Sequence, residues 1–270
     1  MEKGKGVNPS FRIRASVLSD RGRVRANNED NYSLFGTCMA PEQMDAGSFL
    51  PAQTAERELL AAVFDGMGGE ARGEWASHFA AESFSRLRLK GGDDARAQME
   101  SWARKTSRTI ERDGRKHGAA EGTTAVLIRV AGGVAHYAWA GDSRIYCLSG
   151  GKLTMLSRDH SETNMLLDAG ILTPEEAERY PRSHAITRFL GMEESENAIL
   201  ACGTRPLRGG ERFLLCSDGL TDMVPDAELR RILLACPYAD EAAKKLAETA
   251  LENGGRDNVT CLVIDILPSK

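Results

Sequence analysis

The sequence lacks any long apolar run, and this absence argues against a helical membrane protein. No uninterrupted apolar stretch approaches the roughly 20 residues that a helix needs to cross a bilayer. The first six residues, Met1 to Gly6, are polar and lack the apolar core of a signal peptide. We therefore expect a cytoplasmic protein that has no membrane partner.

Paired cysteine motifs are also missing. The chain has six cysteines, and none of them forms a CxxC pair. Several lie inside apolar, strand-like runs, where a reduced thiol packs as a small hydrophobic side chain. The six cysteines are scattered along the chain: Cys38, Cys147, Cys202, Cys216, Cys236 and Cys261.

The chain has little excess charge. Its net charge is -4, and we find no basic stripe with interleaved aromatic residues, so a nucleic-acid partner is not expected. Hydrophobic residues make up 41% and charged residues 27%, which is ordinary for a globular protein. The 270 residues contain no internal repeat and no linker. We therefore expect a single domain over residues 1–270, with its core at about 12–267. We also expect the protein to be a monomer.

One stretch organises the rest of the chain. Six apolar residues, Leu59 to Phe64, predict a strand that is buried on both faces. Asp65 is expected to end that strand, and Gly66, Gly68 and Gly69 follow it within four positions. A carboxylate fixed at a strand end is a good metal ligand, and glycine lets a backbone carbonyl approach an ion closely. A plain turn, with the aspartate as turn residue or helix cap, stays an alternative at this point.

The remaining elements alternate in a way that favours antiparallel sheets, because successive strands are separated by short turns. Residues 38–58 show no clear period and are interpreted as a surface excursion with a helical turn at 54–58. Residues 159–191 contain short helices and loops and predict a flap over a cleft. The expected strands are 11–18, 32–35, 59–64, 122–130, 134–140, 145–148, 152–156, 199–202, 212–216 and 259–266, and the expected longer helices are 76–87, 95–113 and 242–251.

Acidic residues recur at the edges of the predicted strands. They are Glu29, Asp30, Asp65, Asp142, Asp218 and Asp257. If these edges converge, the carboxylates repel one another unless cations lie among them. Oxygen ligands without clustered histidine or cysteine select hard ions such as Mg²⁺ or Mn²⁺. Two such ions about 3.5–4 Å apart activate a water for attack on phosphorus, and Arg25 could hold the phosphate oxygens. The residues alone therefore indicate a binuclear phosphoester hydrolase.

The order of these motifs resembles a known family. The motifs are Arg25-x-x-x-Glu29-Asp30, Asp65-Gly66-x-Gly68-Gly69, Gly122-Thr123-Thr124-Ala125, Gly141-Asp142-Ser143-Arg144, Asp159-His160-Ser161, Ser217-Asp218-Gly219-Leu220-Thr221-Asp222 and Asp257-Asn258. Together they are similar to the metal-dependent serine/threonine phosphatases of the PP2C (PPM) type, and the bacterial branch fits best. The resemblance runs from about Arg14 to Ile266.

The resemblance implies an α+β fold, a four-layer α/β/β/α sandwich of two mostly antiparallel sheets with metals at one end. It also implies roles for the acidic residues. Asp65 would bridge two Mn²⁺ or Mg²⁺ ions, Glu29 and the Gly66 carbonyl would help to hold the second, and Asp218 and Asp257 would complete the first. Asp30 would act through water, Asp142 with Asp218 would hold a third ion, and Arg25 would bind the substrate phosphate.

The sequence departs from the family pattern at two positions. Met67 stands where many animal relatives have a histidine proposed as general acid, and methionine cannot donate a proton. Glu70 stands where many bacterial members have histidine. The group that protonates the leaving oxygen is therefore left open between a metal-bound water and Glu70.

The resemblance implies a phosphatase of phosphoserine and phosphothreonine in proteins, opposing a bacterial serine/threonine kinase. A phosphatase-like sensor with weak or no turnover and a phosphatase of small phosphoesters are the alternatives. The segment 159–191 would contact the substrate. We expect His160 to make a structural hydrogen bond, and we expect no acidic or cysteine partners at ligand spacing for His78, His117, His136 and His184.

Overall fold

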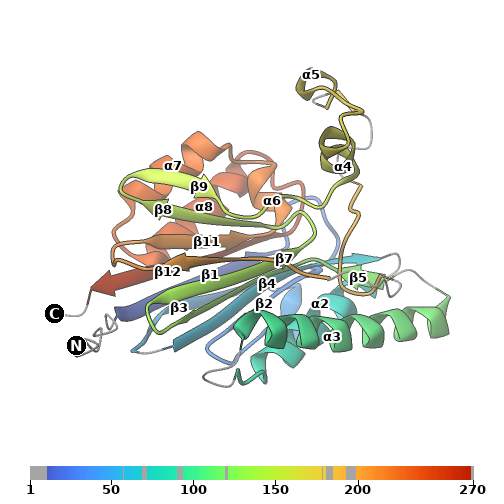
Figure 1. Ribbon diagram of the computed structural model, residues 1–270, viewed down its shortest axis with the longest axis horizontal. Helices are drawn as coiled ribbons and strands as arrows, with labels where there is room; N and C mark the ends of the chain where they lie inside the picture. The colour runs from blue at the N-terminus through green and yellow to red at the C-terminus, as the bar shows by residue number, and fades with distance from the viewer. Residues whose placement is uncertain are drawn as a thin grey trace, which may run out of the picture.

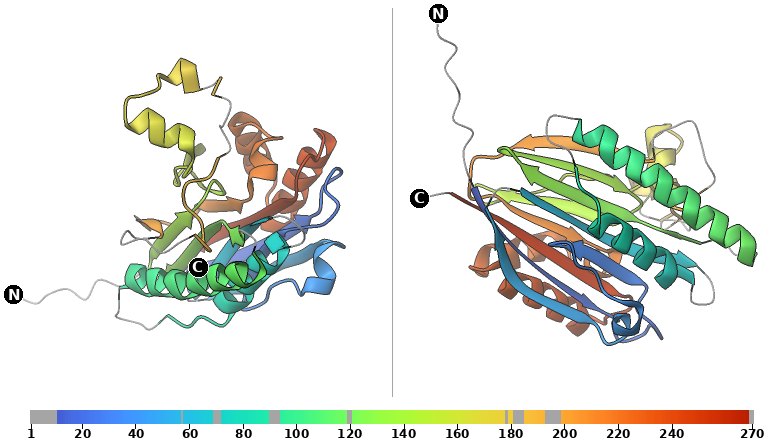
Figure 2. Two further views of the ribbon diagram at one scale, coloured as in Figure 1. Left: turned by 90° about the vertical axis from the view of Figure 1, so that its right-hand side faces the viewer. Right: turned by 90° about the horizontal axis from the view of Figure 1, so that it is seen from below.

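The computed structural model describes residues 11–56, 58–68, 72–89, 94–118, 121–177, 179–180, 185–192 and 199–268. Two antiparallel sheets pack face to face, and helices cover the outer face of each, so the four-layer α/β/β/α prediction is confirmed (Figures 1 and 2). The start of β1 and the end of β12 lie at one end of the sandwich in Figure 1, and the helices α4 and α5 stand out near the other end.

The first sheet has the strand order β3-β1-β12-β11-β8-β9. These strands are β1 (Phe11–Asp20), β3 (Ser48–Ala55), β8 (Arg144–Ser149), β9 (Lys152–Met155), β11 (Arg212–Cys216) and β12 (Val259–Pro268). The second sheet has the order β10-β7-β6-β4-β2, with β5 paired to the end of β4. Its strands are β2 (Asp30–Leu34), β4 (Glu58–Gly68), β5 (Glu121–Thr123), β6 (Ala125–Ala131), β7 (Val134–Ala140) and β10 (Ala201–Pro206).

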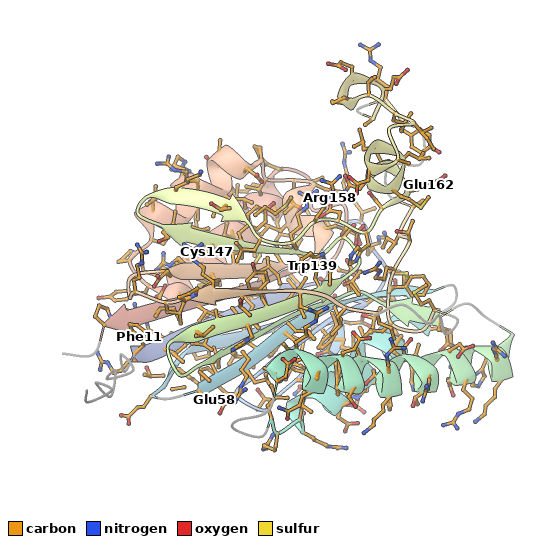
Figure 3. All side chains as sticks on the ribbon, viewed as in Figure 1. Phe11, Glu58, Trp139, Cys147, Arg158 and Glu162 are labelled. Carbon is orange, nitrogen blue, oxygen red and sulfur yellow. The ribbon has the colours of Figure 1, made fainter. Side chains whose placement is uncertain are left out.

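The alternation of side chains along β4 explains why this strand lies in the middle of the molecule. Leu59, Ala61 and Val63 point into the core between the two sheets. Ala62 and Phe64 point the other way, into a second core against the helices. The predicted burial on both faces is confirmed. Cys147, labelled in Figure 3, also belongs to the core between the sheets.

Two helices cover the outer face of the second sheet: α2 (Arg72–Ser85) and α3 (Ala95–His117). The Asp94 carboxylate caps α3 by accepting a hydrogen bond from the Arg96 backbone N–H. This helix continues past residue 113, where its end was expected, and is capped by Gly118, whose φ is 66°. Phe84 of α2 meets Trp102 of α3 edge to face, with 4.9 Å between ring centroids, and this contact joins the helices over Phe64.

The outer face of the first sheet is covered by α7 (Asp226–Ala235) and α8 (Ala239–Glu252), which bury their leucine and alanine faces in a third core. The remaining helices are short: α1 (Pro41–Met44), α4 (Glu162–Asp168), α5 (Pro174–Ala177) and α6 (Asp218–Thr221). A capping box begins α5, because Thr173 and Glu176 exchange hydrogen bonds. None of the described helices combines the length and apolar character of a membrane span.

Three expectations about these elements were wrong. Residues 38–58 are not an irregular excursion with a helical turn at 54–58, because they form α1 and then β3. Asp65 does not end its strand, since β4 continues to Gly68 and pairs there with β5. The strand expected at 199–202 begins at Ala201 and runs to Pro206.

Candidate functional site

The pairing of β2 with β4 brings two acidic positions together. Asp30 lies opposite Asp65 in the antiparallel register. The Gly66 N–H donates to the Glu29 carbonyl at 3.1 Å, which fixes the Glu29–Asp30 pair beside the Asp65–Gly66 peptide. Gly66 has no room for a side chain, because a Cβ there would lie 2.1 Å from the Gly73 carbonyl oxygen.

The first sheet contributes two more acids at the same end of the sandwich. Asp218 begins α6 directly after β11, and Asp257 comes two residues before β12, the neighbour of β11 in the sheet. Gly219 lets these segments meet, since a Cβ at this position would lie 2.0 Å from the Asn258 carbonyl oxygen. Asp142 follows β7 in a turn that needs glycine, because Gly141 has a φ of 106°.

The electrostatics of these carboxylates show that they share one volume. Burial, followed by the charges of Asp30 and Asp218, raises the pKa of Asp65 well above its ordinary value. Asp142 and Asp257 also contribute to that increase. The structure therefore brings the predicted acidic strand edges together, as the sequence analysis expected.

Three of the other acids have raised pKa values as well. Burial and the nearby charges of Asp218 and Asp257 raise the pKa of Asp30 to about 7, against the opposing effect of hydrogen bonds from Ser217 and Thr260. Burial and then Asp218 raise the pKa of Asp142 to about 7. Burial raises the pKa of Glu29, although Arg25 works against that increase.

Two oxygen atoms in this volume have no hydrogen-bond partner among the described residues. They are Oδ1 of Asp30, a residue that is 1% exposed, and Oδ1 of Asp142, which is 8% exposed. Orphaned buried carboxylate oxygens in a cluster of mutually repelling acids are what a hard divalent cation would satisfy. The donor set therefore fits the Mg²⁺ or Mn²⁺ ions that the sequence analysis implied.

Several residues that hold these acids in place were not identified from the sequence. Ser217 and Thr260, both from the first sheet, donate to Oδ2 of Asp30 in the second sheet at 2.6 Å and 2.7 Å. The Asn258 side chain accepts from the Glu29 N–H at 2.8 Å, and its amide donates to two carbonyls of the β1–β2 loop. The sequence shows these three residues only as polar side chains in or beside predicted strands. Their hydrogen-bond partners lie far away along the chain, so no local pattern reveals them.

Arg25 lies on the loop between β1 and β2, at the exposed side of the acidic cluster. Its guanidinium donates to Oδ2 of Asp257 at 2.6 Å, and 51% of its side chain remains exposed. The remaining N–H groups can therefore meet a phosphate that approaches from solvent. Arg25 therefore lies beside the acidic cluster, and its role in phosphate binding stays a prediction.

His160 makes the structural hydrogen bond that was expected. Its Nδ1 accepts from the Gly141 N–H at 3.2 Å, next to Asp142. Burial, with a smaller contribution from Arg188, lowers the pKa of His160 to about 4. His160 therefore joins the start of the segment 159–191 to the turn that carries Asp142. Met67 lies in β4 opposite Gly122, whereas Glu70 and His184 lie outside the described residues.

The expectation for His117 was wrong, because this histidine does have acidic neighbours. Possible ligand atoms of Asp113, His117 and Glu121 lie within 4.8 Å of one another. The Arg72 guanidinium is hydrogen-bonded to all three residues, with a distance of 2.7 Å to Nδ1 of His117. An arginine thus already supplies the positive charge at the place that a metal would take.

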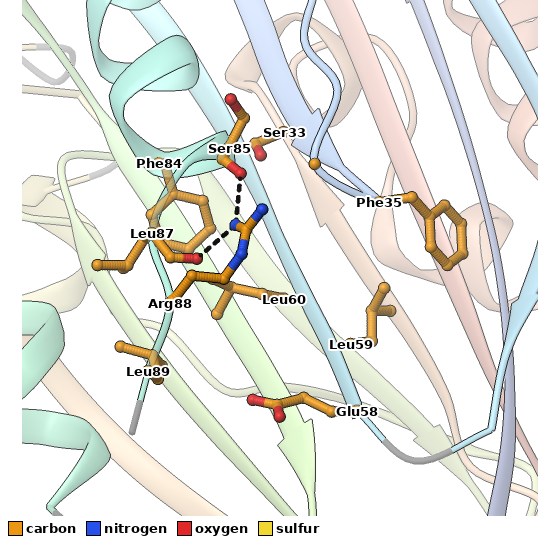
Figure 4. A pocket seen from close by; sticks show the side chains of 11 residues that line it. Ser33, Phe35, Glu58, Leu59, Leu60, Phe84, Ser85, Leu87, Arg88 and Leu89 are labelled. Atoms are coloured by element: carbon orange, nitrogen blue, oxygen red, sulfur yellow. Dashed lines mark hydrogen bonds between the residues drawn. The ribbon is translucent and has the colours of Figure 1, made fainter. Parts of the chain in front are cut away.

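A pocket lies at the opposite end of β4 from Asp65 (Figure 4). Its volume is about 370 Å³, and its walls include Leu59 and Leu60 of β4 and Phe84 of α2. At its wall the Arg88 side chain donates to the carbonyl oxygens of Ser85 and Leu87. None of the acids of the cluster lines this pocket, so it is separate from the candidate site.

Comparison with known sequences identifies a family model and relatives that agree with one another. A family model described as protein phosphatase 2C matches residues 44–254. The serine/threonine protein phosphatase PstP of Mycobacterium tuberculosis is 36% identical over 258 residues, which are 94% of this chain and 45% of PstP. The chain thus spans less than half the length of that relative. The serine/threonine phosphatase stp of Listeria innocua is 31% identical over 263 residues, covering 94% of this chain and 96% of stp.

Solved structures agree with this assignment. The M. tuberculosis PstP/Ppp crystal structure has a TM-score of 0.78 at 36% identity and covers 95% of this chain and 99% of that one. Another PstP structure, whose catalytic domain is in complex with two manganese ions, has a TM-score of 0.75 at 35% identity, with the same coverage. The S. agalactiae serine/threonine phosphatase has a TM-score of 0.79 at 28% identity and covers 94% and 99%. On its sequence, its fold and the acids at one end of its sandwich, the chain belongs to the protein phosphatase 2C family.

Proposed function

We propose that the chain is a metal-dependent phosphatase that hydrolyses phosphoserine and phosphothreonine in proteins. The observation that carries the proposal is the cluster of acids from both sheets, in which buried oxygens of Asp30 and Asp142 lack partners within the part of the chain that the structure describes. Such a cluster is costly without cations, because burial and mutual repulsion both oppose ionisation. The names of the relatives, serine/threonine protein phosphatases, support the reaction class.

The acids would divide two or three Mn²⁺ or Mg²⁺ ions among them. Asp65 would bridge two ions, with Glu29 and the Gly66 carbonyl at the second ion and Asp218 and Asp257 at the first. Asp30 would act through water, and Asp142 with Asp218 would hold a third ion. The two manganese ions in the PstP catalytic domain support this assignment.

When bound, the cations supply a hydroxide nucleophile at neutral pH and neutralise charge on the phosphoryl group. The protein's own contribution is to bind and orient. Arg25 binds phosphate oxygens with the N–H groups that Asp257 leaves available, and the bond to Asp257 keeps the guanidinium over the acids. Ser217 and Thr260 hold Asp30 in one orientation by donating to the same oxygen, Oδ2. The other oxygen, Oδ1, has no hydrogen-bond partner among residues 11–268 as far as the structure describes them.

The proposed substrates are phosphorylated proteins of the cytoplasm, including a serine/threonine kinase and its targets, and the enzyme would act as a monomer. The exposed position of Arg25, which a phosphate on a large protein can reach, supports a protein substrate. The helices α4 and α5 project from the sandwich and would contact the chain around the phosphorylated residue (Figure 1).

The decisive experiment measures hydrolysis of p-nitrophenyl phosphate and of a phosphothreonine peptide with Mn²⁺, with Mg²⁺ and with EDTA. We expect activity only with a divalent cation, and we expect Asp218→Ala to lower kcat/KM by at least about a hundredfold, because the metals supply several kcal/mol of transition-state stabilisation. Glu241→Ala is the matched control, since this exposed acid lies in the first turn of α8, at the opposite end of the helix from Asp257, and its loss should change nothing.

The possible outcomes discriminate between the functions. Activity in EDTA equal to that with Mn²⁺ would contradict the metal-dependent mechanism. Calorimetric Mn²⁺ binding without hydrolysis of either substrate would favour a sensor. Turnover of p-nitrophenyl phosphate but not of any phosphopeptide would favour small phosphoesters as substrates.

A further inference from the structure

Positive charge is concentrated on one helix of a protein whose net charge is -4. Helix α3 carries seven basic residues against three acidic ones, Glu100, Glu111 and Asp113. The basic residues are Arg96, Arg104, Lys105, Arg108, Arg112, Arg115 and Lys116. Helix α8, the long helix of the opposite layer, has only two lysines against four acidic residues. The excess on α3 is therefore a local feature and not the average of the surface.

Four of the basic residues form a single row, which we call the basic stripe: Lys105, Arg108, Arg112 and Arg115. Their spacings of three, four and three residues place them on one side of a helix. All four are exposed, whereas Trp102, Thr106 and Ile110 on the other side are buried. The row is about 15 Å long at 1.5 Å per residue.

The side chains of the stripe also enclose space. Together with Thr109 and Glu111 they line a shallow hollow of about 510 Å³ on the surface of α3. Glu111 is the one acid in this lining, and it forms an ion pair with Arg115. The surface therefore offers a positively charged groove to an extended, negatively charged partner.

The stripe leads toward the catalytic end of the molecule. At the C-terminal end of α3, Asp113 and His117 are hydrogen-bonded to Arg72 at the start of α2, which also binds Glu121 of β5. β5 in turn pairs with Gly66, Met67 and Gly68, the residues that follow Asp65. Figure 1 shows α3 running along the lower layer to the end of the sandwich where β5 lies, opposite the two termini.

From this arrangement we propose that the basic stripe docks an acidic or multiply phosphorylated segment of the substrate protein, next to the residue that is dephosphorylated. The inference rests on the proposed function and names a class of substrate for it. Guanidinium groups bind carboxylates and phosphates through paired hydrogen bonds, which suits such a segment.

Two other anionic partners fit the observations less well. The apolar side of α3 is buried against α2 and the second sheet, so the helix cannot insert into a lipid surface as an amphipathic anchor does. The net charge of -4 opposes the approach of a long polyanion such as RNA. A short acidic segment is attracted by the positive charge of the basic stripe, and salt screens the more distant negative charges of the protein.

The test compares phosphothreonine peptides that have a neutral flank with peptides that have an acidic flank of eight Asp or Glu residues on either side. The variant Lys105→Glu/Arg112→Glu reverses two charges of the stripe. The control Arg230→Glu/Lys245→Glu makes the same charge change on α7 and α8, in the other helical layer. We expect wild type to prefer at least one acidic peptide in kcat/KM, and we expect added NaCl to weaken that preference.

The stripe variant should reduce the ratio of kcat/KM for acidic over neutral peptide by about tenfold, mainly through KM, and the control should leave the ratio unchanged. Equal ratios in wild type and stripe variant would overturn the proposal. So would loss of binding to anionic vesicles or RNA in the variant without any change in the peptide ratio.

Failure of the proposed function would look different. If wild type hydrolyses neither p-nitrophenyl phosphate nor the neutral peptide, the phosphatase assignment fails, and the docking surface is then tested by fluorescence anisotropy of the labelled acidic peptide. Equal affinities of wild type and stripe variant in that measurement would overturn the docking proposal independently.

Discussion

The two ends of β4 have opposite chemistry although they belong to one strand. At one end Asp65 lies among four other carboxylates whose charges oppose its ionisation. At the other end, roughly 20 Å away at 3.3 Å per residue, Leu59, Leu60 and Phe84 line a pocket whose rim also carries polar side chains. At the acidic end, two buried carboxylate oxygens lack a partner among the described residues, whereas at the other end Leu59 and Phe84 are buried by packing.

This difference separates activity from stability along one strand. Substitutions at the acidic end should abolish turnover, and without metal they should not weaken the fold. Substitutions at the apolar end should weaken the fold and leave the chemistry unchanged. The following predictions test that separation, beginning with the largest effect.

The largest effect is expected for Asp65→Asn. Because an amide cannot replace a bridging carboxylate, kcat/KM for a phosphothreonine peptide should fall by at least about a thousandfold with Mn²⁺ present. In EDTA the same variant should melt higher than wild type by a few degrees, since one repelling charge is gone. Steady-state kinetics and thermal unfolding of the same preparations check both parts.

The matched control is Glu58→Gln, which makes the same chemical change at the other end of β4. Glu58 is half exposed and pairs with Arg129 at 2.7 Å, so its loss should cost about 1 kcal/mol or less and leave kcat/KM unaltered. A lower melting temperature for Asp65→Asn than for wild type in EDTA would contradict the repulsion argument.

A substitution at the apolar end should have the converse effect. Phe84→Ala removes a fully buried ring that contacts Phe64 and Trp102, so the free energy of unfolding should fall by about 3–5 kcal/mol. The kcat/KM per folded molecule should stay within about twofold of wild type. Urea unfolding measures the loss of free energy of unfolding. Phe79→Ala, at a half-buried ring on the same helix, should cost less, and equal costs would show that the cavity does not matter.

The smallest effect is a pH dependence in EDTA. Because the pKa of Asp30 is raised to about 7, the folded state holds a proton that the unfolded state has lost between about pH 4 and 7. Ionised Asp30 lowers the free energy of unfolding. This destabilisation is at its maximum above pH 7 and decreases as the pH falls. Lowering the pH from about 7.5 to 5.5 should therefore stabilise the protein by about 2 kcal/mol through Asp30 alone.

His160 works in the opposite direction, because its pKa is lowered to about 4 and its unfolded form gains a proton below about pH 6.5. The Asp30 contribution is therefore obtained as the difference between wild type and Asp30→Asn, measured by urea unfolding at both pH values. A difference between the two proteins that does not change with pH would show that Asp30 is already ionised at neutral pH in the folded state.

Much of this architecture could be predicted from the sequence, because local residue patterns determine many of its strands and helices. The apolar run at 59–64 and the alternation at 11–18 specify their strands through burial, and the acids at the strand edges indicated a shared volume. The strand β3 was missed because it lies at the edge of its sheet. Edge strands tolerate a residue such as Pro51 and show only a half-buried pattern.

The supports of the site could not be predicted, since they depend on tertiary contacts. Asp30 is held by Ser217 and Thr260, which are 187 and 230 residues away along the chain. Asp113, four residues before His117, could have been found from helical spacing if the expected helix had been extended past residue 113. Arg72 and Glu121 could not, because they reach this histidine only after α2 and β5 have packed against α3. Neither pattern nor spacing encodes such a meeting.

The acids at the candidate site come from both sheets: Asp30 and Asp65 belong to one, and Asp218 and Asp257 adjoin the ends of β11 and β12 in the other. A cation held between them would therefore act as a removable cross-link between the two halves of the sandwich. A ligand that binds only the native state stabilises it in proportion to the logarithm of its concentration above Kd. The concentration of manganese or magnesium in the cell would then determine how long each molecule survives proteolysis, as well as its catalytic rate.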